Sequence, residues 1–457
     1  MSERVEVIGA RPDTEGSGLP RTAPPGWSPG AAWRRMMANS FLQHNLLLFV
    51  GNISVSALTF LFHPIIGHLL GNERYGTVVS FGAFTLVLSL PATVIPNVFN
   101  KFTADLIAHG RTDQVNYLLR RGTYYLVIMG VIAGVLFAAA TPFLVRTFKV
   151  PSQYALITSL SFVIAFAAPL ILGVLQGRQQ FAWFSVLNFL GAFLRVVFTA
   201  LFLLKGLGLN GTLIATLLAT LVAYILSFVP LRDIFRGPEA RPPSLKPLFS
   251  YSLGATLALG ASTLLSNTDQ TLAAPFLSLH DASYYDAIAT MGKIVLFVGG
   301  SFVLAMFPKV ATRHQQGLPH GELLAWTIAG VCILSASVVL VFALFPSHVM
   351  NIILPHTPVA IAQNLVWYGL AMLLLEAASV LMGYFMALGR MSFVPILVVC
   401  WGLQVGLFAV WHGSITQMVA VMVTVMAALL AGLIGFYFLR VAPLSHGAGT
   451  GPERALS

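Results

Sequence analysis

Long apolar segments, separated by short polar ones, fill almost the whole of this 457-residue chain. A helix of about 20 apolar residues crosses the roughly 30 Å hydrocarbon core of a membrane. The pattern predicts twelve such spans, at residues 46–70, 77–99, 124–144, 155–175, 184–204, 212–231, 251–277, 287–307, 324–345, 360–386, 393–411 and 418–438. No alternating strand pattern of about ten residues appears. Each span is therefore expected to be an α-helix, because backbone groups that face lipid must be paired within their own segment.

Composition agrees with an all-α polytopic membrane protein. Hydrophobic residues make up 57% of the chain and charged residues 9%, with a mean hydropathy of +0.84, far from the average of soluble proteins. The loops are short, and the sequence has no phosphate-binding glycine loop and no nucleophile elbow. We therefore expect no enzyme and no cofactor. The two cysteines, Cys332 and Cys400, lie within predicted spans, so neither a disulfide framework nor a metal site is expected.

Positive charge is distributed unevenly between the two sides of the predicted bundle. If the N-terminus is cytoplasmic, 19 of the 25 Lys and Arg residues lie on the cytoplasmic side and four on the opposite side. This bias predicts a multi-pass protein of the cytoplasmic (inner) membrane with both termini in the cytoplasm. The net charge of +10 is then explained by this topology and by attraction to anionic lipids at the cytoplasmic face. No nucleic-acid partner is expected.

The chain contains an internal repeat with an offset of about 210 residues. Gly177-Arg178-Gln179-Gln180-Phe181 recurs as Gly389-Arg390-Met391-Ser392-Phe393, and each copy ends one span and opens the next. Gly76 and Ser283 are another related pair. Paired halves are common in transporters. Because six crossings is an even number, the halves keep the same polarity. We therefore expect two six-helix lobes related by a two-fold axis along the membrane normal.

The repeat and the composition together predict five regions. These are a disordered cytoplasmic tail at 1–44, an N-terminal six-helix lobe at 45–231, a basic cytoplasmic linker at 232–246, a C-terminal six-helix lobe at 247–440 and a cytoplasmic tail at 441–457. Between the second and third spans, residues 101–121 predict an amphipathic helix on the inner surface. Its apolar residues, set among polar neighbours, are Phe102, Leu106, Ile107, Tyr117 and Leu118.

Four ionisable residues fall inside predicted spans, where charge is costly and therefore informative. They are Arg195, Asp269, Lys293 and Glu376. Arg195 either faces a polar cargo or bonds to helix carbonyls. Asp269 and Lys293 lie at similar depth on consecutive helices, which predicts an ion pair about 4 Å apart, serving either structure or transport. Glu376 is either a proton or cation coupling site or a satisfied residue of the bundle.

Two further lysines are related by the repeat. Lys101 and Lys309 lie at the inner ends of the second and eighth spans. They are interpreted either as topology anchors or as cations at the inner mouth of a central cavity.

Several short motifs, in this order and spacing, resemble the multidrug/oligosaccharidyl-lipid/polysaccharide superfamily, and within it the polysaccharide-unit flippases. They are Leu70-Gly71-Asn72-Glu73-Arg74-Tyr75-Gly76, Tyr284-Tyr285-Asp286-Ala287, Pro308-Lys309 and the two Gly-Arg-x-x-Phe turns. The resemblance covers about residues 40–440. It implies two six-helix lobes around a cavity that opens alternately to each side, with a polyprenyl-pyrophosphate-linked oligosaccharide as cargo and other polysaccharide-assembly proteins as partners.

The function expected on these grounds is a flippase that moves a lipid-linked oligosaccharide from the inner to the outer leaflet. Such a protein needs a wet groove with positive charge, because an anionic head group cannot cross hydrocarbon unaided. The alternative is an ion-coupled drug or metabolite antiporter of the same fold, which would use acidic residues in its cavity. A third possibility, a scaffold that does not transport, would require no buried charge.

Overall fold

The computed structural model describes residues 40–233 and 246–441. Most of the predicted tails at 1–44 and 441–457, and most of the linker at 232–246, therefore lie outside the described residues. The described residues at 40–44 are helical and not disordered as predicted. By their contacts, the described residues from Leu48 onward form one compact unit. Within the described ranges the regular structure is helical and contains no strand.

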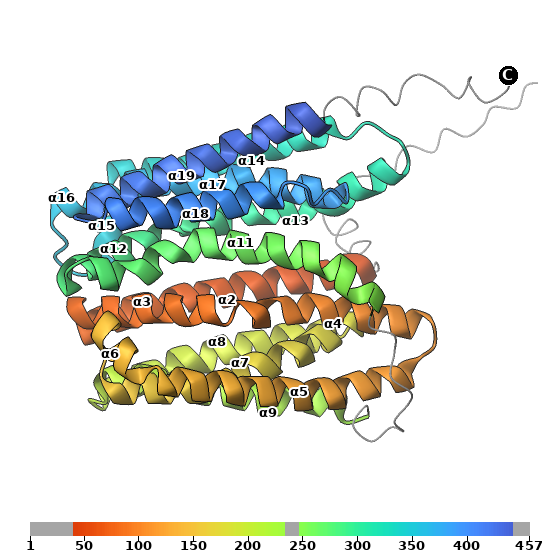
Figure 1. Cartoon of the computed structure of the whole chain (residues 1–457), viewed down its shortest axis with the longest axis horizontal. Coiled ribbons are helices and arrows are strands. Elements are labelled where there is room, and N and C mark those ends of the chain that lie inside the picture. The colour runs from red at the N-terminus through yellow and green to blue at the C-terminus, as the bar shows by residue number, and fades with distance from the viewer. Residues whose placement is uncertain (1–39, 234–245, 442–457) are drawn as a thin grey trace, which may run out of the picture. The chain divides into compact units, whose positions relative to one another are not determined.

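The helices follow one another with short connections (Figure 1). In chain order they are α2 (Ser40–Leu70), α3 (Asn72–Leu88), α4 (Leu90–Ala108), α5 (Thr112–Ala139), α6 (Thr141–Phe148), α7 (Ser152–Gly177), α8 (Phe181–Leu204), α9 (Gly208–Ser227), η1 (Val229–Leu231), α11 (Lys246–Phe276), α12 (Leu279–Gly292), α13 (Ile294–Gln315), α14 (Gly321–Leu344), α15 (Pro346–Asn351), α16 (Val359–Ala362), α17 (Asn364–Ala387), α18 (Val394–Val410), α19 (Ile415–Phe436) and η2 (Tyr437–Val441).

Eight helical segments of the described chain are long and apolar enough to cross a membrane. They are Val50–Leu70, Thr112–Ala139, Ser152–Gly177, Phe181–Leu204, Gly208–Leu231, Gly321–Leu344, Val359–Ala387 and Ile415–Val441. Each contains or overlaps one of the twelve predicted spans. Val394–Val410 is apolar but shorter. The remaining predicted spans, at 77–99, 251–277 and 287–307, are not among these segments. The full count of twelve spans therefore stays a prediction.

Several predicted spans are divided between helices, and two of these breaks lie well inside the span. The span at 77–99 is interrupted at Ser89, between α3 and α4, and Pro91 stands in the first turn of α4. Proline has no backbone N–H and clashes with the preceding turn, so an uninterrupted helix is disfavoured there. The span at 287–307 is interrupted at Lys293, between α12 and α13. The break places the lysine at the junction of two helices within the bundle.

The helices pack mainly with neighbours from their own half of the sequence. In the first half, α7 packs against α4, α5 and α9, and α8 packs against α9. In the second half, α17 packs against α13, α14 and α19, and α18 packs against α19. Contacts between the halves are made chiefly by α3 with α11 and α12, and Figure 1 shows α11 beside α3.

One close approach between the halves joins two repeat-related positions. A Cβ atom added at Gly76 of α3 would lie 2.6 Å from the Cα atom of Ser283 of α12. No side chain fits in such a space, so glycine is required at position 76. When equivalent positions meet each other in this way, they lie on the symmetry axis of a two-fold arrangement. This contact supports the expected parallel relation between the halves, which itself stays a prediction.

The two repeated turns also share a backbone conformation. Gln179 has a φ angle of 58° and Gly389 one of 70°. At the first turn the N–H of Gln180 bonds to the carbonyl of Leu175. At the second turn the N–H of Arg390 bonds to the carbonyl of Phe385. Both are helix ends closed by a left-handed residue. The backbone therefore pairs Gln179 with Gly389, two residues away from the Gly-Arg alignment.

The arginines of the repeat make comparable contacts. The guanidinium of Arg178 donates to both carboxylate oxygens of Asp233, at 3.2 and 2.7 Å. Arg390 donates to the backbone carbonyl of Arg440. Asp233 and Arg440 each follow the last long helix of their half. Each arginine therefore ties the repeated turn to the end of its own half.

The connection between α4 and α5 differs from the prediction. An amphipathic surface helix was expected over 101–121, but α4 continues to Ala108 and α5 begins at Thr112. Gly110 has a φ angle of 71°, a conformation that glycine adopts without strain. The segment is therefore a tight helical hairpin, and its apolar residues Phe102 and Leu106 are buried against other helices of the bundle.

Candidate functional site

Arg195 lies on the inward side of α8. Its guanidinium carbon is 3.8 Å from the centroid of the Phe62 ring on α2, which is a cation–π contact. Its Nε atom is buried and has no hydrogen-bond partner. Among the described residues, no carboxylate forms an ion pair with it. The positive charge of Arg195 is therefore uncompensated in the part of the chain that the structure describes.

Asp269 and Lys293 do not form the predicted ion pair in this structure. Asp269 is fully buried on α11, and one of its oxygens accepts hydrogen bonds from Tyr285 at 3.0 Å and Tyr368 at 2.6 Å. Lys293 donates to the side-chain oxygens of Asn267 and Gln270. Neutral groups are thus the partners of both side chains, and the second oxygen of Asp269 has no partner. The depth count gave the height of each residue but not the direction in which its side chain leaves the helix axis.

A chain of polar side chains connects the two halves near Lys293. The hydroxyl of Tyr75 lies 3.2 Å from His63 Nδ1 and donates to Thr290 at 3.3 Å. Gln270 donates to the same Thr290 hydroxyl, at 3.4 Å. Because Lys293 donates to Gln270, these contacts form a path from Lys293 to His63 of α2. Arg195 contacts Phe62, the residue that precedes His63 in the same helix.

Asp286 is a buried acid that the sequence interpretation missed as a site residue. It is fully buried on α12, and one of its oxygens accepts a hydrogen bond of 2.6 Å from Ser80 of α3. Its other oxygen has no partner. The predicted span began at residue 287, so Asp286 was assigned to a loop. The motif Tyr284-Tyr285-Asp286-Ala287 did single out this acid in the sequence. The sequence did not indicate that a helix begins as early as Leu279, which places Asp286 inside α12.

The remaining predicted residues lie apart from this network. Glu376 is 4% exposed on α17, and its Oε1 atom has no partner. Lys101 on α4 and Lys309 on α13 are both exposed. Among the described residues, no group of three His, Cys, Asp or Glu residues gathers as metal ligands. Among the described residues, no hydrogen bond or ion pair links Glu376 to Arg195 or Lys293.

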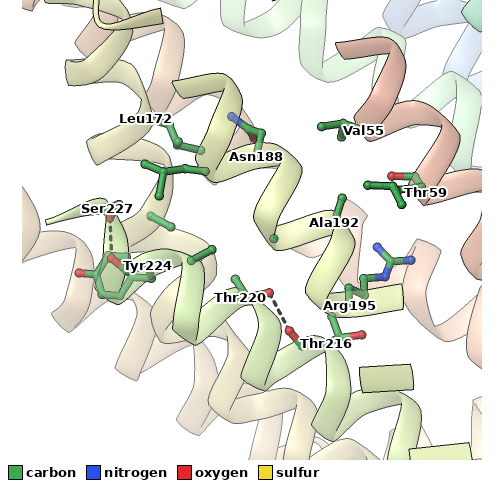
Figure 2. Close-up of a pocket in the computed structure, with 15 residues that line it drawn as sticks. Val55, Thr59, Leu172, Asn188, Ala192, Arg195, Thr216, Thr220, Tyr224 and Ser227 are labelled. Carbon is green, nitrogen blue, oxygen red and sulfur yellow. Dashed lines mark hydrogen bonds between the residues drawn. The ribbon is translucent and has the colours of Figure 1, made fainter. Parts of the chain in front are cut away.

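A cavity of about 280 Å³ lies between α2, α7, α8 and α9, and Arg195 lines it (Figure 2). Its polar lining residues are Thr59, Asn188, Arg195, Thr216, Thr220, Tyr224 and Ser227. Its apolar lining comes from Val55, Leu58, Ala168, Leu172, Leu187, Gly191, Ala192 and Ala223. The sequence interpretation found the arginine but not the hydroxyl residues, although their four-residue spacing along one apolar span was a readable signal.

The opposite faces of these helices carry large apolar side chains. On α8, Phe189 and Phe193 are exposed, and on α9, Leu218 and Ile225 are exposed. Residues on one side of a helix recur every three to four positions. The arginine and the hydroxyl residues therefore point into the bundle, and the exposed apolar residues point outward. Chemically, the cavity presents one cation and several hydroxyl and amide groups, which suits an anionic, polar ligand.

Comparison with protein families gives one match. A family model described as "Polysaccharide biosynthesis protein" matches residues 41–314. Among curated proteins, none matches this chain significantly.

Comparison with solved structures shows the fold. An inward-facing multidrug resistance MATE family transporter of the MOP superfamily is 16% identical, with a TM-score of 0.74 over 85% of this chain and 95% of that chain. An outward-facing MATE family transporter is 17% identical, with a TM-score of 0.64 over 89% and 96%. MATE in the straight conformation is 17% identical, with a TM-score of 0.63 over 89% and 96%. At these identities, the similarity concerns the fold alone.

Proposed function

The chain belongs to the polysaccharide biosynthesis protein family, within the MOP superfamily of membrane transporters, and from this premise we propose its specific function. It moves a lipid-linked oligosaccharide from the inner to the outer leaflet by alternating access. The head group of such a lipid is an anionic pyrophosphate bearing sugars, and hydrocarbon excludes it. The protein therefore has to supply a polar, cationic path.

The observation that carries the proposal is the position of Arg195, a buried cation without a carboxylate partner among the described residues, which lines the cavity. Lys293 is a second cation, at a helix break in the second half. Arginine binds phosphate oxygens through two parallel hydrogen bonds. Arg195 is the cation proposed to hold the pyrophosphate. Lys101 and Lys309 are proposed to attract it at the inner mouth, where the anionic lipid surface also lies.

The contacts between the halves support a state closed at one end. Asn72 donates to the hydroxyl of Tyr284 at 3.0 Å. A Cβ atom at Gly67 would lie 3.0 Å from the carbonyl carbon of Ile353. These contacts lie where α2 ends and where α3 and α12 begin. In the proposed orientation, with both termini cytoplasmic in the inner membrane, this is the outer end. Cargo would therefore enter from the cytoplasmic side in this state.

An ion-coupled antiporter is the second candidate, and buried carboxylates favour it. Asp269, Asp286 and Glu376 are each less than 5% exposed, and each has an oxygen without a partner. All three lie in the second half, whereas the cavity lies in the first. Cations would also be repelled by Arg195. These features favour an anionic cargo. The role left for the three carboxylates is to carry a proton or a cation that drives transport.

The test is lipid translocation in proteoliposomes with purified protein. Arg195→Ala should abolish translocation of a glycosylated polyprenyl pyrophosphate, and Arg195→Lys should retain part of it, since a point charge remains. Arg146→Ala, at an exposed cation of α6, is the matched control and should stay active. If Arg195→Ala transports normally while Glu376→Gln loses ion-dependent efflux of a cationic dye, the antiporter is the correct function.

A further inference from the structure

A row of hydroxyl residues on α9 forms one wall of the cavity. Thr216, Thr220 and Ser227 recur at helical spacing and cover about 16 Å of the helix, at a rise of about 1.5 Å per residue. Figure 2 shows Thr216 near Arg195, with Ser227 at the far end of the row. On α8, Asn188 faces the same space. The wall is therefore polar over a length greater than a phosphate group requires.

The hydroxyl donors of this wall, and one N–H of Asn188, are already used. Thr216 donates to the carbonyl of Thr212 at 2.9 Å, Thr220 to that of Thr216 at 2.7 Å, and Ser227 to that of Tyr224. The amide of Asn188 donates to the carbonyl of Phe184 at 2.8 Å. A hydroxyl oxygen retains accepting capacity after it donates, and so does the oxygen of an asparagine amide. The wall thus presents acceptors to the cavity.

The two ends of the cavity consequently differ in hydrogen-bonding character. Arg195 offers donors only, whereas Thr216, Thr220 and Asn188 offer acceptors. Small residues, Gly191 and Ala192, line α8 between Asn188 and Arg195, so the two regions form one space. A phosphate or carboxylate has only acceptors and suits the arginine. A sugar hydroxyl is a donor and suits the wall.

We propose that the cavity is a bipartite site in which Arg195 binds the phosphate and the α9 hydroxyl wall binds the adjoining glycosyl group. This proposal rests on the proposed function and assigns the recognition of the sugar to residues that the phosphate does not need. The volume of about 280 Å³ lies just below the usual range for small-molecule sites, about 300–1,000 Å³. The wall therefore contacts the sugar nearest the phosphate, and the rest of the oligosaccharide remains outside.

The same arrangement discriminates against other ligands. A cationic drug would find acceptors along α9 but would meet the charge of Arg195. A simple anion would bind at Arg195 and leave the wall unused. Only a ligand that is both anionic and hydroxylated satisfies both regions, and specificity arises from buried polar groups that a wrong ligand leaves unpaired.

The test measures binding to the full-length protein in nanodiscs by isothermal titration calorimetry. The ligands are citronellyl pyrophosphate and its glucosyl, galactosyl and N-acetylglucosaminyl derivatives. The variants are Thr216→Val with Thr220→Val, which remove the acceptors and nearly keep the shape, and Arg195→Ala. The matched control is Thr424→Val, an exposed threonine of α19 that donates to the carbonyl of Ala420 at 2.8 Å.

The wild-type protein and Thr424→Val should bind at least one glycosylated ligand roughly tenfold more tightly than citronellyl pyrophosphate, as two or so hydrogen bonds would give. The double valine variant should lose this preference and keep its affinity for citronellyl pyrophosphate. If it keeps the preference, or if the wild type has none, the α9 wall is not a sugar site. Loss of all binding in Arg195→Ala supports the proposed function in either case, and unchanged binding there contradicts it.

Discussion

The side chain of Asp286, a buried acid at the contact between the halves, accepts one hydrogen bond. Ser80 donates to Asp286 at 2.6 Å from across the interface, and the second oxygen of Asp286 has no partner. A buried carboxyl group that loses its last partner costs about 1–3 kcal/mol, or more when charged. The interface therefore depends on a hydroxyl group whose removal changes almost no volume.

This leads to a prediction for Ser80→Ala and Asp286→Asn. Ser80→Ala should lower the free energy of unfolding by about 1–3 kcal/mol, because Asp286 is left buried without this donor. Asp286→Asn should cost less, since the asparagine oxygen still accepts from Ser80. Thermal unfolding of purified protein in detergent measures both. Equal stability of wild type and Ser80→Ala would show that water or another group satisfies the acid.

His320 gives a prediction for the dependence of stability on pH. It lies just before α14, is 9% exposed, and its Nδ1 atom lies 2.7 Å from the hydroxyl of Tyr384. Burial, and then the neighbouring His314, lowers the pKa of His320 below its usual 6.5. The unfolded chain thus takes up a proton at a higher pH than the folded protein does. The stability due to neutral His320 is present above pH 6.5 and is lost as the pH falls through and below that value.

The measurement is Tm against pH for wild type and His320→Gln, whose amide still bonds to Tyr384 but does not titrate. The wild-type Tm should fall more steeply than that of His320→Gln between pH 7 and 5. Parallel curves over this range would mean that His320 titrates alike in the folded and unfolded chains.

At the level of single residues, the sequence indicated which charges are costly but not what they contact. Arg195 was recognised because an arginine in an apolar span is rare. The partners of Asp269, Tyr285 and Tyr368, come from α12 and α17 and could not be read from depth alone. Pairing across helices depends on rotation about each helix axis, and a linear count of residues does not fix that rotation.

At the level of helices, the contact between α3 and α12 is the natural gate. The two helices meet at Gly76 and Ser283 without room for a side chain, and Asn72 reaches Tyr284 at the same end. Alternating access requires one end of the cavity to open when the other closes. Under the proposed function, the two helices therefore separate here in every transport cycle.

Cross-linking tests this separation. In a background without Cys332 and Cys400, a short bifunctional thiol reagent that joins Asn72→Cys to Tyr284→Cys should stop lipid translocation, and cleaving the link should restore it. The control joins Gln153→Cys to Asn210→Cys, two first-half positions bonded at 3.0 Å. That link should leave transport intact. Transport by the linked α3–α12 protein would show that this end does not open.

The sequence predicted where most helices lie but not where they break. Apolar length marks a span, and eight of the predicted spans meet that criterion in the structure. The interruptions at Ser89 and Lys293 do not change apolarity, so hydrophobic periodicity cannot detect them. Pro91 was a usable signal for the first break, whereas Lys293 has no equivalent signal in the sequence.

At the level of the whole molecule, three features agree with a repeat of about 210 residues, and the relation between the halves stays a prediction. Gly76 meets Ser283, Gln179 and Gly389 close equivalent turns, and two arginines tie those turns to the ends of their halves. The sequence suggested this relation because tight turns and close contacts require particular residues. The structure shifts the turn by two residues, since a glutamine adopts the left-handed conformation where the second half uses glycine.

The dependence of α3 on the second half has a consequence for biosynthesis. By length and composition, neither α3 nor α4 is among the segments able to cross a membrane, and the polar partners of α3, Thr290 and Asp286, lie more than 200 residues later in the chain. When only the first half has been synthesised, the polar side chains of α3 do not yet have these partners from the second half. Insertion of this segment should therefore be finished only after α11 and α12 emerge.

Membrane-impermeant thiol labelling can follow this in cells. The first half contains no cysteine, so Asn72→Cys and Arg111→Cys report the two ends of the α3–α4 segment directly. In the full chain they should be labelled from opposite sides of the membrane. In a chain that stops at residue 233, a larger fraction should expose both on one side, and co-expression of the second half should reduce that fraction. Identical labelling of the two chains would mean that α3 inserts without its later partners.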